Sequence, residues 1–196
     1  PGIEDISPLK GMPLVALGLV GHRLVKDLSP LQECPLRYLY VGNNAASDLS
    51  PLAGRPLEVL YLEGDAIQDI GPIGGAPLRV LGLAACPSVA DLSPISKCTK
   101  LEFLWTPVAL PPPPAQLTDQ LPNLKYLNPD AGNAEAQAHR WSVGRQIKNE
   151  WIRSLETAVE GPERAPGLAA LTKSILTGRP TKARQHWLQN EDGLGE

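Results

Sequence analysis

One phrase, Pro-Leu-x-x-Leu-x-Leu, recurs along this chain at almost constant spacing and constrains its fold more than any other feature. Its four clear copies and two weaker ones begin at Pro13, Pro35, Pro56, Pro77, Leu101 and Leu124. The first leucines of successive copies lie 21 to 23 residues apart, and a second phrase typified by Asp-Leu-Ser-Pro-Leu keeps register with them. Units of this length stack into a solenoid, because each one can bury its apolar residues only against its neighbours.

Each repeat divides into a strand and a return segment. In the Leu-x-x-Leu-x-Leu part, leucines alternate with other residues, as expected for one strand of a parallel sheet whose leucines face the core. The proline of the second phrase cannot donate a ladder hydrogen bond, so it predicts a turn or a short 3₁₀ segment on the opposite side. A unit of this length leaves little room for a full helix there.

Together the two phrases resemble the leucine-rich repeats of bacterial internalin-like proteins, and more closely those appended to some bacterial serine/threonine kinases. The resemblance covers about residues 3–130. It implies an α/β leucine-rich-repeat solenoid with a parallel sheet on the concave face and turns or 3₁₀ segments on the convex side. About six units would fill residues 1–130. The first unit is incomplete because its strand is missing, so we expect further structure upstream of Pro1.

Composition and motif spacing argue against several functions. A formal net charge of −3 gives no reason to expect nucleic acid or an anionic membrane as a partner, and no apolar run approaches the length of a membrane span. No kinase motif, catalytic constellation, phosphate-binding loop or metal-ligand spacing is present, so we predict a protein that is not an enzyme and has no cofactor or metal.

The cysteines indicate a reducing compartment. Cys34 and Cys98 lie three units apart, which corresponds to about 14 Å at the usual strand spacing. A disulfide needs Cα atoms within about 7 Å. With Cys86 as an odd third residue, we expect thiols and a cytoplasmic location.

The positions between the leucines carry the functional signal. The third and fifth positions point away from the core, and they hold all four tyrosines, the single phenylalanine and one tryptophan. Aromatic side chains are enriched in interface hot spots, and an exposed apolar strip marks a binding surface. We predict a protein-recognition or regulatory module whose concave face binds a protein partner, either another subunit or an upstream domain of the same protein. The predicted partner-binding residues are Tyr38, Tyr40, Val59, Tyr61, Glu63, Phe103, Trp105 and Tyr126.

Other interpretations stay open. The C-terminal segment or an upstream domain could cover the aromatic strip inside the same molecule, or the aromatic residues could reflect strand propensity alone. In functional terms, the alternative is a structural or regulatory domain packed against the catalytic part of a larger bacterial enzyme or effector.

After Pro129 the repeats give way to helical patterns. Residues 133–160 predict an amphipathic helix that is capped by Asn133. Its apolar stripe would hold Val143, Ile147, Trp151, Leu155 and Ala158. Shorter helices are expected at about residues 166–177 and 180–189, and the whole of 131–196 would form a helical C-terminal cap or a docking segment.

Overall fold

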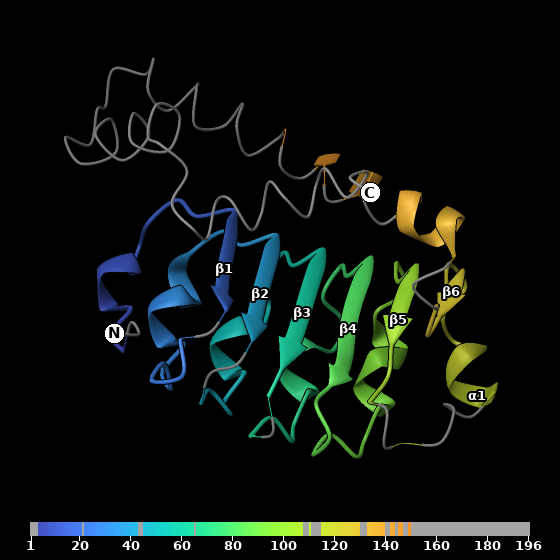
Figure 1. Ribbon diagram of the computed structural model, residues 1–196, viewed down its shortest axis with the longest axis horizontal. Helices are drawn as coiled ribbons and strands as arrows, with labels where there is room; N and C mark the ends of the chain where they lie inside the picture. The colour runs from blue at the N-terminus through green and yellow to red at the C-terminus, as the bar shows by residue number, and fades with distance from the viewer. Residues whose placement is uncertain are drawn as a thin grey trace, which may run out of the picture. The chain divides into compact units, whose positions relative to one another are not determined.

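In the computed structural model, six parallel strands form one sheet, and short 3₁₀ segments line its other side (Figure 1). The structure describes residues 4–20, 22–42, 45–64, 66–107, 110, 115–129, 133–139, 142–143, 145–146 and 149. The strands follow chain order and are β1 (Ala16–Val20), β2 (Tyr38–Gly42), β3 (Val59–Glu63), β4 (Val80–Ala85), β5 (Phe103–Trp105) and β6 (Tyr126–Leu127). This arrangement confirms the predicted leucine-rich-repeat solenoid.

The return segments alternate with the strands along the chain. The 3₁₀ segments are η1 (Ser7–Leu9), η2 (Ser29–Glu33), η3 (Ser50–Leu52), η4 (Gly71–Ile73) and η5 (Ser93–Lys97). One short α-helix, α1 (Ala115–Thr118), takes their place before β6. The sequence prediction of 3₁₀ segments at the Asp-Leu-Ser-Pro-Leu phrases is therefore confirmed.

The leucine ladder forms a single continuous core. Leu39, Leu60 and Leu81 lie side by side in neighbouring strands, and each is 0% exposed. Burying one leucine side chain contributes roughly 1.5–3 kcal/mol, so the stacked units stabilise one another through many such contributions. The leucines face the return segments, which leaves the side chains between them on the opposite, outer face of the sheet.

An aspartate starts each return segment. Asp48 accepts hydrogen bonds from the backbone N–H and the hydroxyl of Ser50, both at 2.8 Å. These bonds, the backbone one first, lower the pKa of the Asp48 carboxyl. The proline that follows sits in the first turn, where its missing N–H costs nothing. The same aspartate–serine contact recurs at Asp5, Asp27 and Asp91.

The return segments end in one of two ways, with a glycine or with a buried cysteine. Gly11, Gly54 and Gly75 take positive φ angles of 68°, 68° and 84°, a conformation that favours glycine. After the longer segments η2 and η5, a buried cysteine ends the segment and its thiol donates to the preceding unit. Cys34 Sγ lies 3.4 Å from the Leu9 carbonyl oxygen, and Cys98 Sγ lies 3.6 Å from that of Ile73. Desolvation by burial raises the pKa of both thiols.

The helical residues that follow the repeats begin as predicted. Residues 134–139, 142–143 and 145–146 are helical, and the Asn133 side-chain oxygen accepts the Ala136 backbone N–H at 2.9 Å. We call the described residues between 133 and 146 the covering segment. They belong to the compact unit Pro1–Lys148, and Asn149–Glu196 forms a second unit. The predicted division of the chain between residues 130 and 131 stays a prediction.

Several predictions fall outside the described residues. They concern the later stripe residues Ile147, Trp151, Leu155 and Ala158, and the helices at 166–177 and 180–189. Within the part of the chain that the structure describes, no helix is long and apolar enough to cross a membrane.

Candidate functional site

The outer face of the sheet carries the predicted aromatic surface as two rows of side chains, which we call the aromatic face. The strand register aligns the first row as Tyr38, Val59, Val80, Phe103 and Tyr126. It aligns the second row as Tyr40, Tyr61, Gly82 and Trp105. Glu63 lies beside Gly42 at the end of β3. The eight residues predicted from the sequence therefore share one face, although their role in binding stays a prediction.

Tyr61 lies at the centre of the half-buried part of this face, which we call its open part. Its ring centroid lies 5.7 Å from that of Tyr40, 6.5 Å from that of Tyr38 and 6.3 Å from that of Trp105, with all three pairs tilted. A side chain at Gly82 would place its Cβ 2.5 Å from Tyr61 Cδ1, so the glycine makes room for the ring. Tilted pairs contribute about 0.5–1.5 kcal/mol each beyond the area they bury, which holds the rings in a fixed arrangement.

The covering segment lies over part of the aromatic face. Ala136 and Val143 pack in one buried cluster with Val59, Val80 and Phe103. The Phe103 ring is also stacked with His139 at a centroid distance of 5.2 Å. Here the structure supports the alternative in which the chain covers its own aromatic strip.

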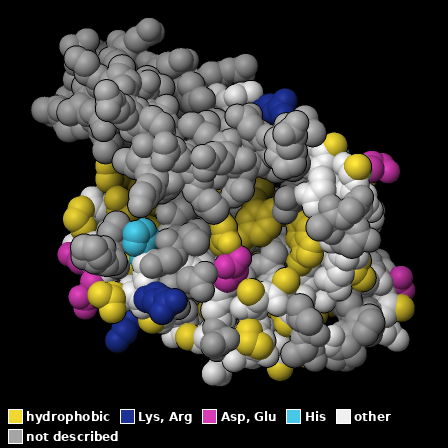
Figure 2. All heavy atoms as spheres, in the orientation of Figure 1, with side chains coloured by type: hydrophobic (Ala, Val, Ile, Leu, Met, Phe, Trp, Pro, Cys, Tyr) yellow, Lys and Arg dark blue, Asp and Glu magenta, His cyan; other side chains and the backbone are white. Residues whose placement is uncertain are grey.

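The covering segment decides which predicted residues a partner could touch. Val59 and Phe103 are 2% and 0% exposed, so they cannot contact a partner in this arrangement. The remaining six predicted residues are half-buried, and Figure 2 shows hydrophobic side chains gathered on this face with charged side chains around them. Those six are Tyr38, Tyr40, Tyr61, Glu63, Trp105 and Tyr126.

Tyr40 and Glu63 form a polar contact inside the apolar surface. The Tyr40 hydroxyl donates a hydrogen bond to the Glu63 carboxylate. Desolvation, and then this bond, raise the pKa of Tyr40. A Cβ on Gly42 would lie 2.9 Å from Tyr40 Cε2 and 3.1 Å from Glu63 Oε2, so the glycine provides the space in which the two side chains meet.

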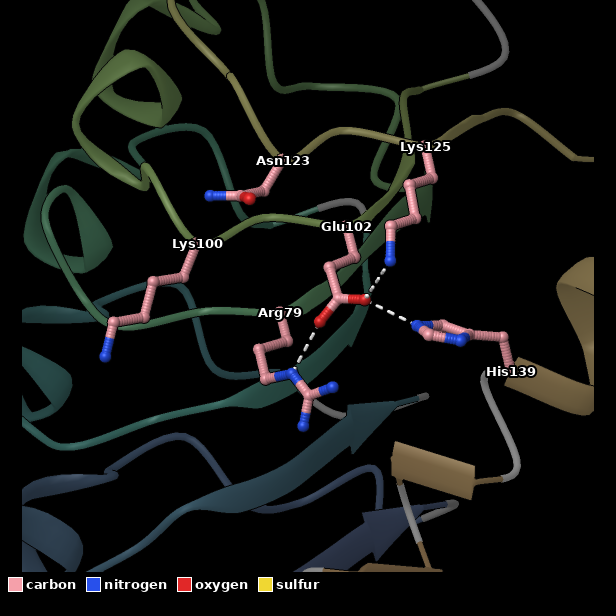
Figure 3. Close-up of a pocket in the computed structure, with 6 residues that line it drawn as sticks. All are labelled: Arg79, Lys100, Glu102, Asn123, Lys125 and His139. Carbon is pink, nitrogen blue, oxygen red and sulfur yellow. Dashed lines mark hydrogen bonds and ion pairs between the residues drawn. The ribbon is translucent and has the colours of Figure 1, made fainter.

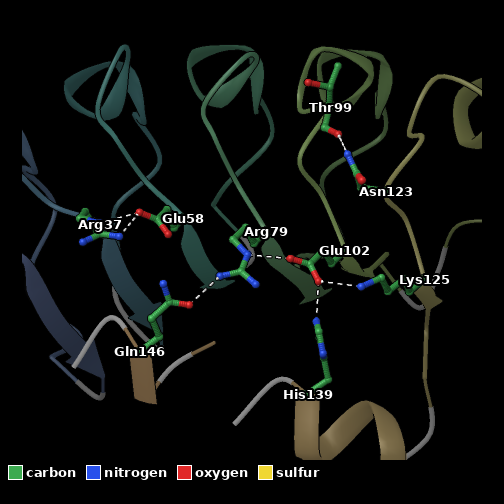
Figure 4. Close-up of polar contacts among 9 residues, drawn as sticks. All are labelled: Arg37, Glu58, Arg79, Thr99, Glu102, Asn123, Lys125, His139 and Gln146. Atoms are coloured by element: carbon green, nitrogen blue, oxygen red, sulfur yellow. Dashed lines mark hydrogen bonds and ion pairs between the residues drawn. The ribbon is translucent and has the colours of Figure 1, made fainter. Parts of the chain in front are cut away.

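A second feature, a row of alternating charges along the edge of the aromatic face, was missed by the sequence reasoning. The residue directly after the first leucine of each unit is charged from the second unit onward. Neighbours in this row touch through the backbone, as in the Arg79 N–H bond to the Glu58 carbonyl at 2.7 Å. We call these residues the charge row: Arg37, Glu58, Arg79, Glu102 and Lys125 (Figure 4).

Side chains of the charge row pair with each other. Arg37 Nε lies 2.5 Å from a Glu58 carboxylate oxygen. Arg79 Nε lies 2.6 Å from Glu102 Oε1, and Lys125 Nζ lies 3.3 Å from Glu102 Oε2. The signal for this row was present in the sequence, because aligning the second to sixth units places opposite charges at the same position of successive repeats.

The charge row also anchors the covering segment. His139 Nε2 lies 2.5 Å from Glu102 Oε2, and Arg79 donates to the Gln146 side chain at 3.3 Å. Burial of Glu102, whose side chain is 12% exposed, acts to raise its pKa, but the bonds from Arg79 and His139 outweigh burial and lower it. His139 and Gln146 lie on the same helical stripe as Ala136 and Val143, so one face of the segment makes both its apolar and its polar contacts.

These polar groups line an open pocket of about 390 Å³ (Figure 3). Its lining residues are Arg79, Lys100, Glu102, Asn123, Lys125 and His139. None of them is a serine, threonine or cysteine nucleophile, and Glu102 is held ionised by three donors, which makes it a weak base. No group of three or more metal-ligating side chains occurs in the described ranges. The geometry fits a structural junction between sheet and covering segment.

The fold and the two rows define a leucine-rich-repeat protein with a self-covered outer face. The chain matches no protein-family model and no curated protein. Among solved structures, it is similar to the internalin inlF from Listeria monocytogenes, with 26% identity and a TM-score of 0.50 over 65% of this chain. A second Listeria monocytogenes internalin is 20% identical over 64% of this chain and 76% of its own length, with a TM-score of 0.36. The chain spans 44% of the length of inlF, which is less than half of that protein.

Proposed function

We propose that this chain is a non-catalytic bacterial recognition module that binds a protein partner on the open part of its aromatic face. The observation that carries the proposal is the arrangement of Tyr38, Tyr40, Tyr61 and Trp105, which are half-buried and held by ring contacts on a rigid sheet. Such side chains present a large contact area at little further entropic cost, which favours binding. The likeness to an internalin is consistent with this role.

The surface beside these rings supports a docking role. At Gly18, next to Tyr40 in the strand register, a Cβ would meet no atom within 4 Å. A partner side chain could therefore reach the floor of the sheet between β1 and β2. Hot spots of protein interfaces are aromatic anchors beside such recesses. The three buried thiols are consistent with a cytoplasmic protein, as the sequence predicted.

The second candidate function is a structural or regulatory domain of a larger bacterial enzyme or effector, packed against its catalytic part. One observation favours it. The chain already uses Val59 and Phe103 of the same face for an internal contact with Ala136 and Val143. A face that accepts one segment of its own protein could accept a second. In that case the open aromatic residues would be covered within the parent protein.

The test compares two double variants as baits in a native cell extract, followed by titration of the purified partner. Tyr40→Ala with Tyr61→Ala removes the central ring pair. Gln32→Ala with Lys97→Ala changes two exposed residues of the return segments and serves as the control. We expect the tyrosine variant to bind the partner at least about tenfold more weakly than the control, because hot-spot truncations cost about 2 kcal/mol or more. Equal affinity of the two variants would contradict the proposal.

A further inference from the structure

Glu63 differs from the other acidic residues that border the aromatic face. Glu58 is paired with Arg37, and Glu102 is paired with Arg79 and Lys125. Glu63 is half-buried, and it accepts the Tyr40 hydroxyl through Oε1. Among the residues that the structure describes, no lysine or arginine forms an ion pair with it. A half-buried carboxylate without a cation has lost part of its hydration and gains from meeting one.

The surroundings of Glu63 suit a cation in a second way. The Tyr40 ring and Glu63 Oε2 lie together over Gly42, where a Cβ would be only 2.9 Å and 3.1 Å from them. Tyr61 is tilted by 56° from Tyr40 and by 54° from Tyr38, so the three rings touch at an angle and do not form a flat stack. Aromatic rings beside a carboxylate attract ammonium and guanidinium groups, through the ring quadrupole and the negative charge together.

We infer that Tyr38, Tyr40, Tyr61 and Glu63 form a subsite for a cationic side chain, an arginine or a lysine, of the protein partner. The inference rests on the proposed function and names the chemistry of its contact. The cation would lie over the Tyr40 and Tyr61 rings, whose centroids at 5.7 Å are too close to admit it between them, and donate to Glu63 Oε2, since Oε1 is occupied by the Tyr40 hydroxyl. A guanidinium group fits best, because it can stack on a ring and donate to a carboxylate at the same time.

The experiment uses the full chain with ¹³C-labelled tyrosine and follows the ring resonances by NMR. The probe is the peptide acetyl-Gly-Arg-Gly-amide. Its matched control carries citrulline in place of arginine, which keeps the shape and removes the charge. We expect the arginine peptide to shift the resonances of Tyr38, Tyr40 and Tyr61 in a saturable way and to leave Tyr126 unchanged. The citrulline peptide should have little effect.

A charge-removing variant makes the test specific. Glu63→Gln keeps an oxygen for the Tyr40 hydroxyl but lacks the negative charge, and Glu4→Gln makes the same change at an exposed position. We expect Glu63→Gln to weaken binding of the arginine peptide roughly fivefold to tenfold relative to Glu4→Gln. Equal shifts with both peptides, or equal affinity of both variants, would overturn the inference.

The two proposals can fail separately. If the partner is lost by the double tyrosine variant but bound equally by Glu63→Gln and wild type, the recognition face stands and the cation subsite is wrong. If the arginine peptide binds as expected but the partner is indifferent to the tyrosine change, the subsite stands and the proposed partner face is wrong.

Discussion

At the scale of single residues, Leu60 shows what one position of the repeat contributes. It is 0% exposed and lies between Leu39 and Leu81 of the neighbouring strands. Its burial therefore depends on the units on both sides of it. A change here acts on the stacking of the units and not on one unit alone.

We expect Leu60→Asp to abolish cooperative folding. The change removes a buried leucine, which costs about 2–5 kcal/mol, and places an unpaired carboxylate in the core at a cost of several more. Together these match the whole stability of a typical domain of about 5–15 kcal/mol. Thermal unfolding followed by circular dichroism checks the prediction. Leu24→Asp is the control, because Leu24 is 50% exposed. A cooperative transition in Leu60→Asp would show that the leucine register is wrong.

At the scale of elements, the covering segment is held by one face of a helix. Ala136 and Val143 fill the apolar side of the contact, and His139 and Gln146 bond to the charge row. The sheet carries its own ladder of backbone hydrogen bonds and its own leucine core on the other side. We therefore expect the repeats to stay folded without the covering segment, whereas the segment needs the repeats as its packing surface.

We expect Val143→Asp to detach the covering segment while the repeats stay folded. Val143 is 2% exposed, and a carboxylate there would be buried against apolar side chains without a partner. Hydrogen exchange read by mass spectrometry should show faster exchange in residues 133–146 and unchanged protection in β2 to β4. Ser142→Asp, at an exposed neighbouring position, is the control and should exchange as the wild type does. Unchanged protection in Val143→Asp would mean that the segment is held by other contacts.

The sequence predicted the repeats better than it predicted what covers them. Leu60 and Asp48 were placed correctly because the repeat period specifies both the core and the return turn. Phe103 was predicted as exposed on the outer face, but its burial depends on Ala136 and His139, more than 30 residues away, and a repeat pattern contains no information about such a contact. The contact between His139 and Glu102 joins residues 37 positions apart, and no spacing in the sequence indicates it.

At the scale of the whole molecule, the charge row connects neighbouring units in a fixed order. Arg37, Glu58, Arg79, Glu102 and Lys125 alternate in sign from one unit to the next. Opposite charges on adjacent strands stabilise by about 0.2–1 kcal/mol, and like charges destabilise by a similar amount. Each charged residue therefore forms an opposite-charge pair with its present neighbours. It would form a like-charge pair with the residue two units away.

We expect the effect of Arg37→Glu to change sign when one unit is removed. In the full chain it places a carboxylate beside Glu58 and should lower the unfolding midpoint. Deletion of residues 57–77 brings Arg37 beside Arg79, and there the same substitution restores an opposite pair and should raise the midpoint. Thermal unfolding of the four proteins at low salt measures both effects, and high salt should shrink them. An effect of the same sign in both backgrounds would contradict this account.

Because the charges alternate, the loss of an odd number of units and the loss of an even number have different effects on the charge row. Solenoids can change length by gaining or losing whole units, since each unit contacts only its neighbours. Here the loss of residues 57–77, a single unit, leaves Arg37 beside Arg79, whereas the loss of residues 57–100, which comprise two units, brings Arg37 beside Glu102 and preserves the alternation. Within this stretch, an internal deletion or insertion therefore preserves the alternation only when it comprises an even number of units.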